Sequence, residues 1–249
     1  MKSGKTFTVI NQARMTSTRL PGKVLKPVLG KPLLEYQIER IRRSRHLHDL
    51  VIATTVNAED QAIVALCERL NVHVFRGSEM DVLGRYYQAH LKYPSTHIIR
   101  VTSDCPLHDP QILDHCIEQY LDSGMNYMSN SEAYPNGMNV EIFSAEMLAE
   151  ANNQGLKPYE REHVTPYFYT HPELFRLGQV RSEQVYPKYR LTVDTPEDFQ
   201  LIQTLIERLW PVKPNFDLAD ICHEFDKDPS LNQINSHIEQ KKYNETQKK

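Results

Sequence analysis

Apolar residues follow two different periodicities along the first part of the chain. Runs rich in β-branched and apolar residues predict strands at 6–10, 50–55, 72–75 and 97–102, of which the first two are expected to be buried. Between these runs, apolar residues recur at helical spacing and predict helices at 32–41, 57–70 and 78–89, with Asn57 and Ser78 as the capping residues. Strands that alternate with helices in this way indicate βαβ units and a mostly parallel sheet.

The pattern becomes less regular in the second half of the chain. Further strands are predicted at 126–130, 175–180 and 189–193, and another follows the turn signal Asn136-Gly137. Helices are predicted at 144–153, at 158–170 and after Thr195, which is followed by an acidic residue at the third helical position. A short amphipathic piece at 216–225 precedes a polar tail at 232–249, which we expect to be disordered.

Composition narrows the class of protein. The chain has 249 residues and a formal net charge of -3, so its charge does not favour nucleic acid or an anionic membrane as a partner. It contains no run as long as a membrane span and no signal-peptide core near Met1. Its four cysteines lack Cys-x-x-Cys spacing, which argues against a zinc knuckle and a disulfide framework. We therefore expect a cytoplasmic protein without nucleic-acid or membrane partners.

The loop between the first strand and the first helix carries the most suggestive chemistry. It places the cations Arg14, Arg19 and Lys23 beside the hydroxyl groups of Thr16, Ser17 and Thr18. Cations and hydrogen-bond donors at the start of a helix can bind an anion, and we propose the triphosphate of a nucleotide. The loop has neither a Walker sequence nor Gly-x-Gly-x-x-Gly, so an ordinary solvated basic loop is the alternative.

Two aspartates follow predicted strands and form the second candidate feature. Asp104 comes after the strand at 97–102, and Asp194 follows the strand at 189–193. In a parallel sheet both could face the edge where ligands bind, and two carboxylates near a triphosphate would hold magnesium. Each aspartate could instead cap the turn or helix that comes after it.

Five segments occur in the order found in a known family. They are Gln12–Leu25, Phe75–Tyr87, Arg100–Pro106, Glu160–Tyr167 and Leu191–Phe199. In these segments the chain resembles the cytidylyltransferases grouped with the spore coat polysaccharide biosynthesis protein SpsF. These are relatives of the enzymes that activate 3-deoxy-manno-octulosonate and acylneuraminate with CTP. The resemblance covers roughly residues 6 to 209.

The resemblance implies a fold, a reaction and an assembly. The fold would be the three-layer α/β/α nucleotide-diphospho-sugar transferase fold, with a mostly parallel mixed sheet. The reaction would transfer CMP from CTP to a sugar acid or a phosphorylated sugar or polyol, with release of pyrophosphate and with Mg²⁺ as cofactor. A homodimer in surface polysaccharide synthesis is expected. Residues 1–210 would form the catalytic domain, with acceptor binding or dimerisation at about 130–185, and 211–249 would add a short helix and the polar tail.

The resemblance also implies roles for individual residues. The catalytic residues would be Arg14, Lys23 and Asp104, and the metal ligands would be Asp104 and Asp194. The nucleotide would contact Ala13, Arg14, Ser17, Arg19, Lys23, Gly77, Ser78, Asp81 and Arg100. The acceptor would contact Glu141, Glu160 and His163. Two positions depart from the family pattern, because Gly84 replaces an acidic residue found in many members and Ser103 replaces a common glycine.

Two other functions remain open from the sequence. A glycosyltransferase that consumes a nucleotide sugar would need an acidic pair such as Asp-x-Asp at its metal site, whereas Ser103-Asp104-Cys105 offers one carboxylate. A non-catalytic nucleotide-binding protein could have kept the pocket and lost turnover. Retention of Arg14, Lys23, Asp104 and Asp194 argues against this second alternative.

Overall fold

A computed structural model describes residues 4–154 and 157–240. Within these ranges a seven-stranded sheet has the order β5-β4-β1-β6-β8-β7-β9. The strands are β1 (Phe7–Gln12), β4 (Asp49–Thr55), β5 (His73–Gly77), β6 (His97–Thr102), β7 (Tyr127–Ser129), β8 (Glu141–Ser144) and β9 (Leu177–Gln179). Of these strands β8 alone runs antiparallel to its neighbours, so the prediction of a mostly parallel mixed sheet is confirmed.

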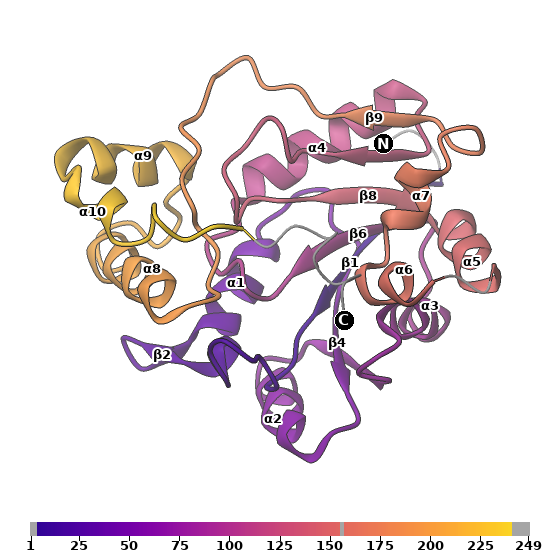
Figure 1. Cartoon of the computed structure of the whole chain (residues 1–249), viewed down its shortest axis with the longest axis horizontal. Coiled ribbons are helices and arrows are strands. Elements are labelled where there is room, and N and C mark those ends of the chain that lie inside the picture. The colour runs from indigo at the N-terminus through magenta and orange to yellow at the C-terminus, as the bar shows by residue number, and fades with distance from the viewer. Residues whose placement is uncertain (1–3, 155–156, 241–249) are drawn as a thin grey trace.

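Helices cover both faces of the sheet and give the predicted three layers (Figure 1). One face packs against α1 (Leu33–Ile41), α2 (Gln61–Arg69), α4 (Pro110–Ser123) and α8 (Pro196–Leu209). The other packs against α3 (Val82–Lys92), α5 (Ala145–Asn153), α6 (Pro158–His163) and α7 (Pro166–Thr170). Successive side chains of a strand point to opposite faces, so Val9 enters the first core and Ile10 the second, and both are fully buried.

The loops that follow the parallel strands open at one edge of the sheet. Gln12 pairs with Thr102 of β6 and with Ala53 of β4, and Thr55 pairs with Gly77 at the end of β5. The chain after β1 forms the 3₁₀ turn η1 (Lys23–Leu25) and the hairpin β2 (Pro27–Val28) and β3 (Lys31–Pro32) before α1. The predicted binding edge is therefore formed by the ends of β1, β4, β5 and β6.

The C-terminal part packs against the first core. Phe216 and residues of α9 (Leu218–Lys227) are buried beside α8, and α10 (Ser230–Gln233) follows. The expectation of a disordered tail is wrong for 232–240, because Asn235 is buried and the chain after α10 returns toward the sheet (Figure 1). Residues 241–249 of that tail lie outside the described ranges.

Several sequence-based element boundaries need correction. Asp81 rather than Ser78 caps α3, since its carboxylate accepts a bond of 2.9 Å from the Gly84 N–H. Asn57 lies at the start of the 3₁₀ turn η2 (Ala58–Asp60), which precedes α2, and its side chain makes no cap hydrogen bond. The predicted helix at 158–170 is two helices, because Val164 has a φ of 72°.

Two further differences concern the segments 189–193 and Pro110–Ser123. The prediction of a strand at 189–193 is wrong, since within the described chain this segment forms one isolated bridge, between Asn136 and Arg190. Helix α4 was not predicted, although Asp109 caps it and Pro110 occupies its first turn.

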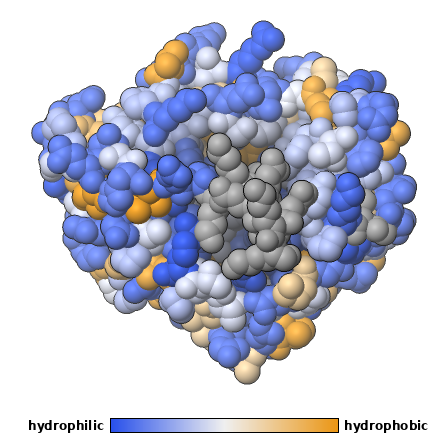
Figure 2. Space-filling view, viewed as in Figure 1, coloured by the Kyte–Doolittle hydropathy of each residue, from blue (hydrophilic) through white to orange (hydrophobic). Residues whose placement is uncertain are grey.

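Two expectations drawn from composition can be compared with the structure. The four cysteines are all free, as expected for a chain without a disulfide framework. Among the described residues, helices long and apolar enough to span a bilayer are absent. Figure 2 shows a face that is mostly hydrophilic, with apolar side chains in separate small groups.

Candidate active site

A pocket of about 560 Å³ lies at the carboxyl ends of the parallel strands. We call it the carboxyl-edge pocket. Its lining comes from the end of β1 and the loop after it, from the loop between β5 and α3, from the first turn of α3, from the end of β6 and the turn after it, from α6 and from Asp194. The lining residues are Gln12, Ala13, Arg14, Ser17, Thr18, Arg19, Lys23, Val24, Glu79, Met80, Val82, Arg85, Thr102, Ser103, Asp104, Glu162, His163 and Asp194.

The ammonium group of Lys23 lies between two carboxylates. Its Nζ is 2.9 Å from Oδ1 of Asp194 and 3.3 Å from Oδ2 of Asp104, and it donates to the Val193 carbonyl at 2.8 Å. Gly22 precedes η1 with a φ of 68°, a backbone conformation that glycine adopts at little cost. Burial lowers the pKa of Lys23, but Asp104 and Asp194 outweigh it, so the net pKa is raised and the group stays charged.

Asp104 is held at the end of β6 by its own turn. Its Oδ1 accepts a hydrogen bond of 2.5 Å from the Thr102 hydroxyl group. Burial raises the pKa of Asp104, but Lys23 and the Thr102 hydrogen bond more than offset this and lower it below its usual value. Burial also raises the pKa of the neighbouring Cys105 thiol, so this thiol is not an activated nucleophile.

Asp194 is surrounded by cations on both of its oxygens. Oδ1 contacts Lys23 at 2.9 Å and Arg19 at 3.0 Å, whereas Oδ2 accepts from Arg190 at 2.9 Å. Arg190 in turn pairs with Asp198, which forms the capping box of α8 with Thr195. Segments far apart in sequence thus converge on one carboxylate.

Glu79 ties together the loops after three neighbouring strands. Its Oε1 accepts from Arg14 at 3.1 Å and from the Thr16 hydroxyl group, and its Oε2 accepts from Asn57 at 2.6 Å. The hydrogen bonds from Thr16 and Asn57 lower the pKa of Glu79, with a smaller contribution from Arg14. This carboxylate fixes the rim of the pocket on which Arg14 lies.

The structure brings eight of the predicted site residues together. Those that line the carboxyl-edge pocket are Ala13, Arg14, Ser17, Arg19, Lys23, Asp104, His163 and Asp194. His163 comes from α6, and burial lowers its pKa, which favours the neutral imidazole.

The remaining predicted residues lie outside that lining. Their side chains or backbones serve neighbouring contacts instead: Gly77 ends β5, Ser78 accepts from Arg85, Asp81 pairs with Arg161, Arg100 pairs with Glu141, and Glu160 caps its own helix. Asp81 and Arg161 form a two-bond pair, with distances of 2.7 and 2.8 Å, that joins α3 to α6.

Other side chains at the site were not predicted from the sequence. Glu79, Arg85 and Glu162 line the pocket, and Arg190 and Asp198 lie directly behind Asp194. Glu79 and Arg85 belong to the segment 75–87, which the family resemblance already singled out, so that segment carried a usable signal. Arg190 lies in a region predicted to be a strand, where nothing in the pattern distinguishes it.

Comparisons with known proteins show the family to which the chain belongs. The family model described as Cytidylyltransferase matches residues 8–249. The chain belongs to the cytidylyltransferase family. It is 36% identical over 227 residues to the spore coat polysaccharide biosynthesis protein SpsF of Bacillus subtilis, covering 88% of this chain and 94% of SpsF. As a member of this family it is a CTP-dependent nucleotidyltransferase.

Two further relatives cover nearly the whole length. An uncharacterized protein of Methanocaldococcus jannaschii is 38% identical over 240 residues, which are 96% of this chain and 98% of that protein. A cytidylyltransferase structure from Leptospira borgpetersenii superposes with a TM-score of 0.87 at 33% identity, covering 95% of this chain and 100% of the other. The similarity to the Leptospira cytidylyltransferase structure therefore covers nearly the whole fold of this chain.

The carboxylates of the pocket fit a divalent cation that also binds phosphate. Within residues 4–154 and 157–240, no three His, Cys, Asp or Glu side chains gather as a complete metal cage. The carboxylates of Asp104 and Asp194 nevertheless both contact the ammonium group of Lys23, so one positive charge already lies between them. Two carboxylates with further positions left for phosphate and water are a donor set that suits Mg²⁺.

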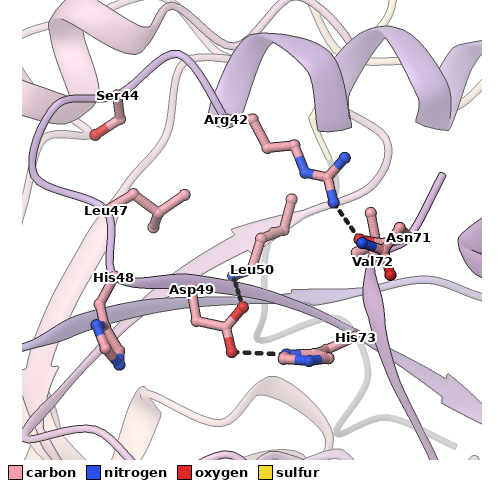
Figure 3. A pocket seen from close by; sticks show the side chains of 9 residues that line it. All are labelled: Arg42, Ser44, Leu47, His48, Asp49, Leu50, Asn71, Val72 and His73. Atoms are coloured by element: carbon pink, nitrogen blue, oxygen red, sulfur yellow. Dashed lines mark hydrogen bonds and ion pairs between the residues drawn. The ribbon is translucent and has the colours of Figure 1, made fainter.

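A second pocket, of about 350 Å³, lies at the opposite edge of the sheet, where β4 and β5 begin (Figure 3). We call it the amino-edge groove. Its Arg42 donates to the carbonyl groups of Leu70 and Asn71, and its His73 pairs with Asp49 at 2.7 Å. Because these polar groups already have hydrogen-bond or ion-pair partners within the protein, we assign no ligand to this groove.

Proposed function

We propose that this cytidylyltransferase transfers CMP from CTP to a sugar acid or a phosphorylated sugar or polyol, releases pyrophosphate, and uses Mg²⁺. One observation carries the proposal: Lys23 lies between Asp104 and Asp194, in a pocket whose other cations are Arg14, Arg19 and Arg85. Cations beside paired carboxylates suit a triphosphate with its metal. The name of the SpsF relative suggests a role in polysaccharide synthesis.

The chemistry requires charge stabilisation more than covalent catalysis. An acceptor oxygen attacks the α-phosphorus of CTP in line, and the bond to the pyrophosphate oxygen breaks. Negative charge then increases on the leaving oxygens, where Arg14, Arg19 and Lys23 would bind them. Ser17, in the same loop, offers a hydroxyl donor to the phosphates.

Lys23 would have to exchange partners when CTP binds. In the structure its charge is neutralised by two carboxylates, and a triphosphate would draw it toward the leaving group. Asp104 and Asp194 would then hold Mg²⁺, which supplies charge neutralisation at the phosphate oxygens when bound. Preorganisation of this set, rather than a nucleophilic side chain, would provide most of the rate enhancement.

The acceptor side of the proposal rests on the wall formed by α6. Glu162 and His163 line the pocket there, and a neutral His163 could accept the proton of an attacking hydroxyl group. A phosphorylated acceptor would need no such base, because its oxygen is already ionised. We further propose a homodimer, as the family resemblance implies, and a cytoplasmic location, as the composition indicates.

Pyrophosphate release tests the proposal directly. CTP, UTP, ATP and GTP would each be combined with Mg²⁺ and a panel of sugar acids, sugar phosphates and polyol phosphates. Release with CTP and one acceptor class supports the proposal and identifies the acceptor. Release with another nucleotide in preference to CTP would contradict it.

A further inference from the structure

Asp194 is oriented by a layer of buried side chains behind the pocket. Its Oδ1 faces the pocket residues Lys23 and Arg19, whereas its Oδ2 accepts from Arg190 at 2.9 Å. Asp194 and Arg190 are both less than a tenth exposed, so water competes little for this contact. One oxygen is thus fixed from behind, and the other remains directed into the pocket.

Arg190 is itself held in one orientation. Its Nε and Nη2 donate to the two oxygens of Asp198 at 2.8 and 2.9 Å, a two-bond pair that fixes the guanidinium plane. Asp198 is fully buried and also accepts from the backbone N–H of Asp194 at 2.9 Å. Hydrogen bonds therefore hold both the carboxylate and the backbone of Asp194 in place relative to the first turn of α8.

The C-terminal segment closes this network. Asn235 is buried, and its Nδ2 donates to the Arg190 carbonyl and to Oδ1 of Asp198, both at 2.9 Å. Gln240 accepts from Nη1 of Arg190 and, at 2.9 Å, from Asn136. Asn235 and Gln240 are far from the pocket lining in sequence, yet both contact the residue that orients Asp194.

We propose that Arg190 is a positioning residue for the metal-binding carboxylate of Asp194, and that Asn235 and Gln240 of the C-terminal segment hold Arg190 in place. This inference rests on the proposed function, in which Asp194 binds a divalent cation. Residues that hydrogen-bond a metal ligand from behind fix its orientation, and their loss weakens metal binding by about 10–100-fold. The charges also balance, because Lys23, Arg19 and Arg190 face Asp104, Asp194 and Asp198.

Binding of Mn²⁺, followed by electron paramagnetic resonance in the presence of CTP, tests the inference without an acceptor. The variants are Arg190→Lys, which keeps the charge but loses the two-bond geometry, Arg190→Gln, and Asn235→Ala. Arg208→Gln is the matched control, since Arg208 lies in α8, pairs with Asp228 at 2.8 Å and is not part of the pocket lining. Melting temperature reports whether each variant is folded, and calorimetry with a chelator measures CTP binding without metal.

We expect Arg190→Lys and Arg190→Gln to weaken Mn²⁺ binding about tenfold or more, Asn235→Ala to weaken it less, and Arg208→Gln to leave it within about twofold. The affinity for CTP without metal should change little. A general structural defect would instead lower both the Mn²⁺ affinity and the metal-free CTP affinity. Normal Mn²⁺ affinity in a folded Arg190→Lys protein, or equal losses of metal-free CTP binding, would overturn the inference alone. A wild-type protein that binds CTP but no Mn²⁺ would instead overturn the metal site of the proposed function.

Discussion

The carboxyl-edge pocket and the amino-edge groove lie at opposite edges of one sheet and use their charged side chains differently. In the groove each charge has a local partner: Arg42 serves two carbonyl groups, and Asp49 pairs with His73. In the pocket one ammonium group, that of Lys23, is shared between Asp104 and Asp194. A cation shared between two carboxylates can change partners when an anionic ligand binds. Charged groups that are already fully paired within the protein would gain little from binding such a ligand.

The two edges differ because of strand direction. Parallel strands place all their following loops at the same edge, so the loops after β1, β5 and β6 meet in the carboxyl-edge pocket. The amino ends of β4 and β5 follow helices, whose last carbonyl groups lack hydrogen-bond donors within the helix. Arg42 donates hydrogen bonds to the carbonyl groups of Leu70 and Asn71, just after α2. Substitutions at the two edges should therefore have unequal effects on activity and binding.

The largest difference is expected for the carboxylates. Asp104→Asn should lower kcat by about 10³-fold or more, because it removes a proposed metal ligand and one partner of Lys23. Asp49→Asn, the matched change in the amino-edge groove, should leave kcat within about twofold. Pyrophosphate release with the acceptor identified by the panel measures both rates. Comparable losses in the two variants would show that the edges do not differ in this way.

Removal of the shared cation should have the next largest effect. Lys23→Met keeps most of the side-chain length but removes the charge that would stabilise pyrophosphate, so kcat should fall by about 10²–10³-fold. Arg42→Met at the other edge serves as the control and should cost stability without a comparable loss of kcat. A Lys23→Met protein with a near-normal rate would exclude Lys23 from the reaction.

The regular half of the fold could be predicted from sequence because it depends on local periodicity. β1, β4, β5 and β6 are short segments that contain β-branched and apolar residues, and their alternation with helices identifies a parallel sheet. The positions of Lys23 and Asp104 near one another follow from strand direction and a short connection. Local pattern and topology suffice for these residues.

The contacts of Arg190 could not be predicted in the same way. Its partners are Asp194, Asp198, Asn235 and Gln240, and the last two are brought close only by the return of the chain after α10. The segment 189–193 was predicted as a strand because its aromatic and β-branched residues are typical of one, yet tertiary packing leaves it with a single bridge. Glu79 was missed for a related reason, since its three partners come from two other loops.

Acid should destabilise the fold through His108, which is buried just after the pocket residue Asp104. The pKa of His108 is lowered from 6.5 to about 4, mainly by burial; the nearby charge of Arg40 also lowers it, and Asp104 raises it by a smaller amount. The unfolded chain then binds more protons than the folded one between these values, so the free energy of unfolding falls as the pH drops from about 6.5 to 4. The expected contribution is about 3 kcal/mol.

Chemical denaturation across this pH range measures that contribution. His108→Asn should reduce the slope of unfolding free energy against pH between 4 and 6.5, whatever its effect on stability at pH 7. An unchanged slope would mean that other groups dominate acid unfolding.

The smallest expected effect comes from breaking one ion pair at each edge and comparing the KM for CTP. Glu79→Gln should weaken the contact with Arg14, whose side chain is nearly half exposed, and such pairs contribute about 0.2–1 kcal/mol. A less restrained Arg14 should raise the KM for CTP by up to about fivefold with little change in kcat, because the loop rim is loosened while Lys23 and Asp104 keep their contacts. His73→Asn breaks the corresponding pair with Asp49 in the amino-edge groove and should leave the KM for CTP unchanged. If Glu79→Gln lowers kcat instead, Glu79 acts on the reacting phosphate and not only on the position of Arg14.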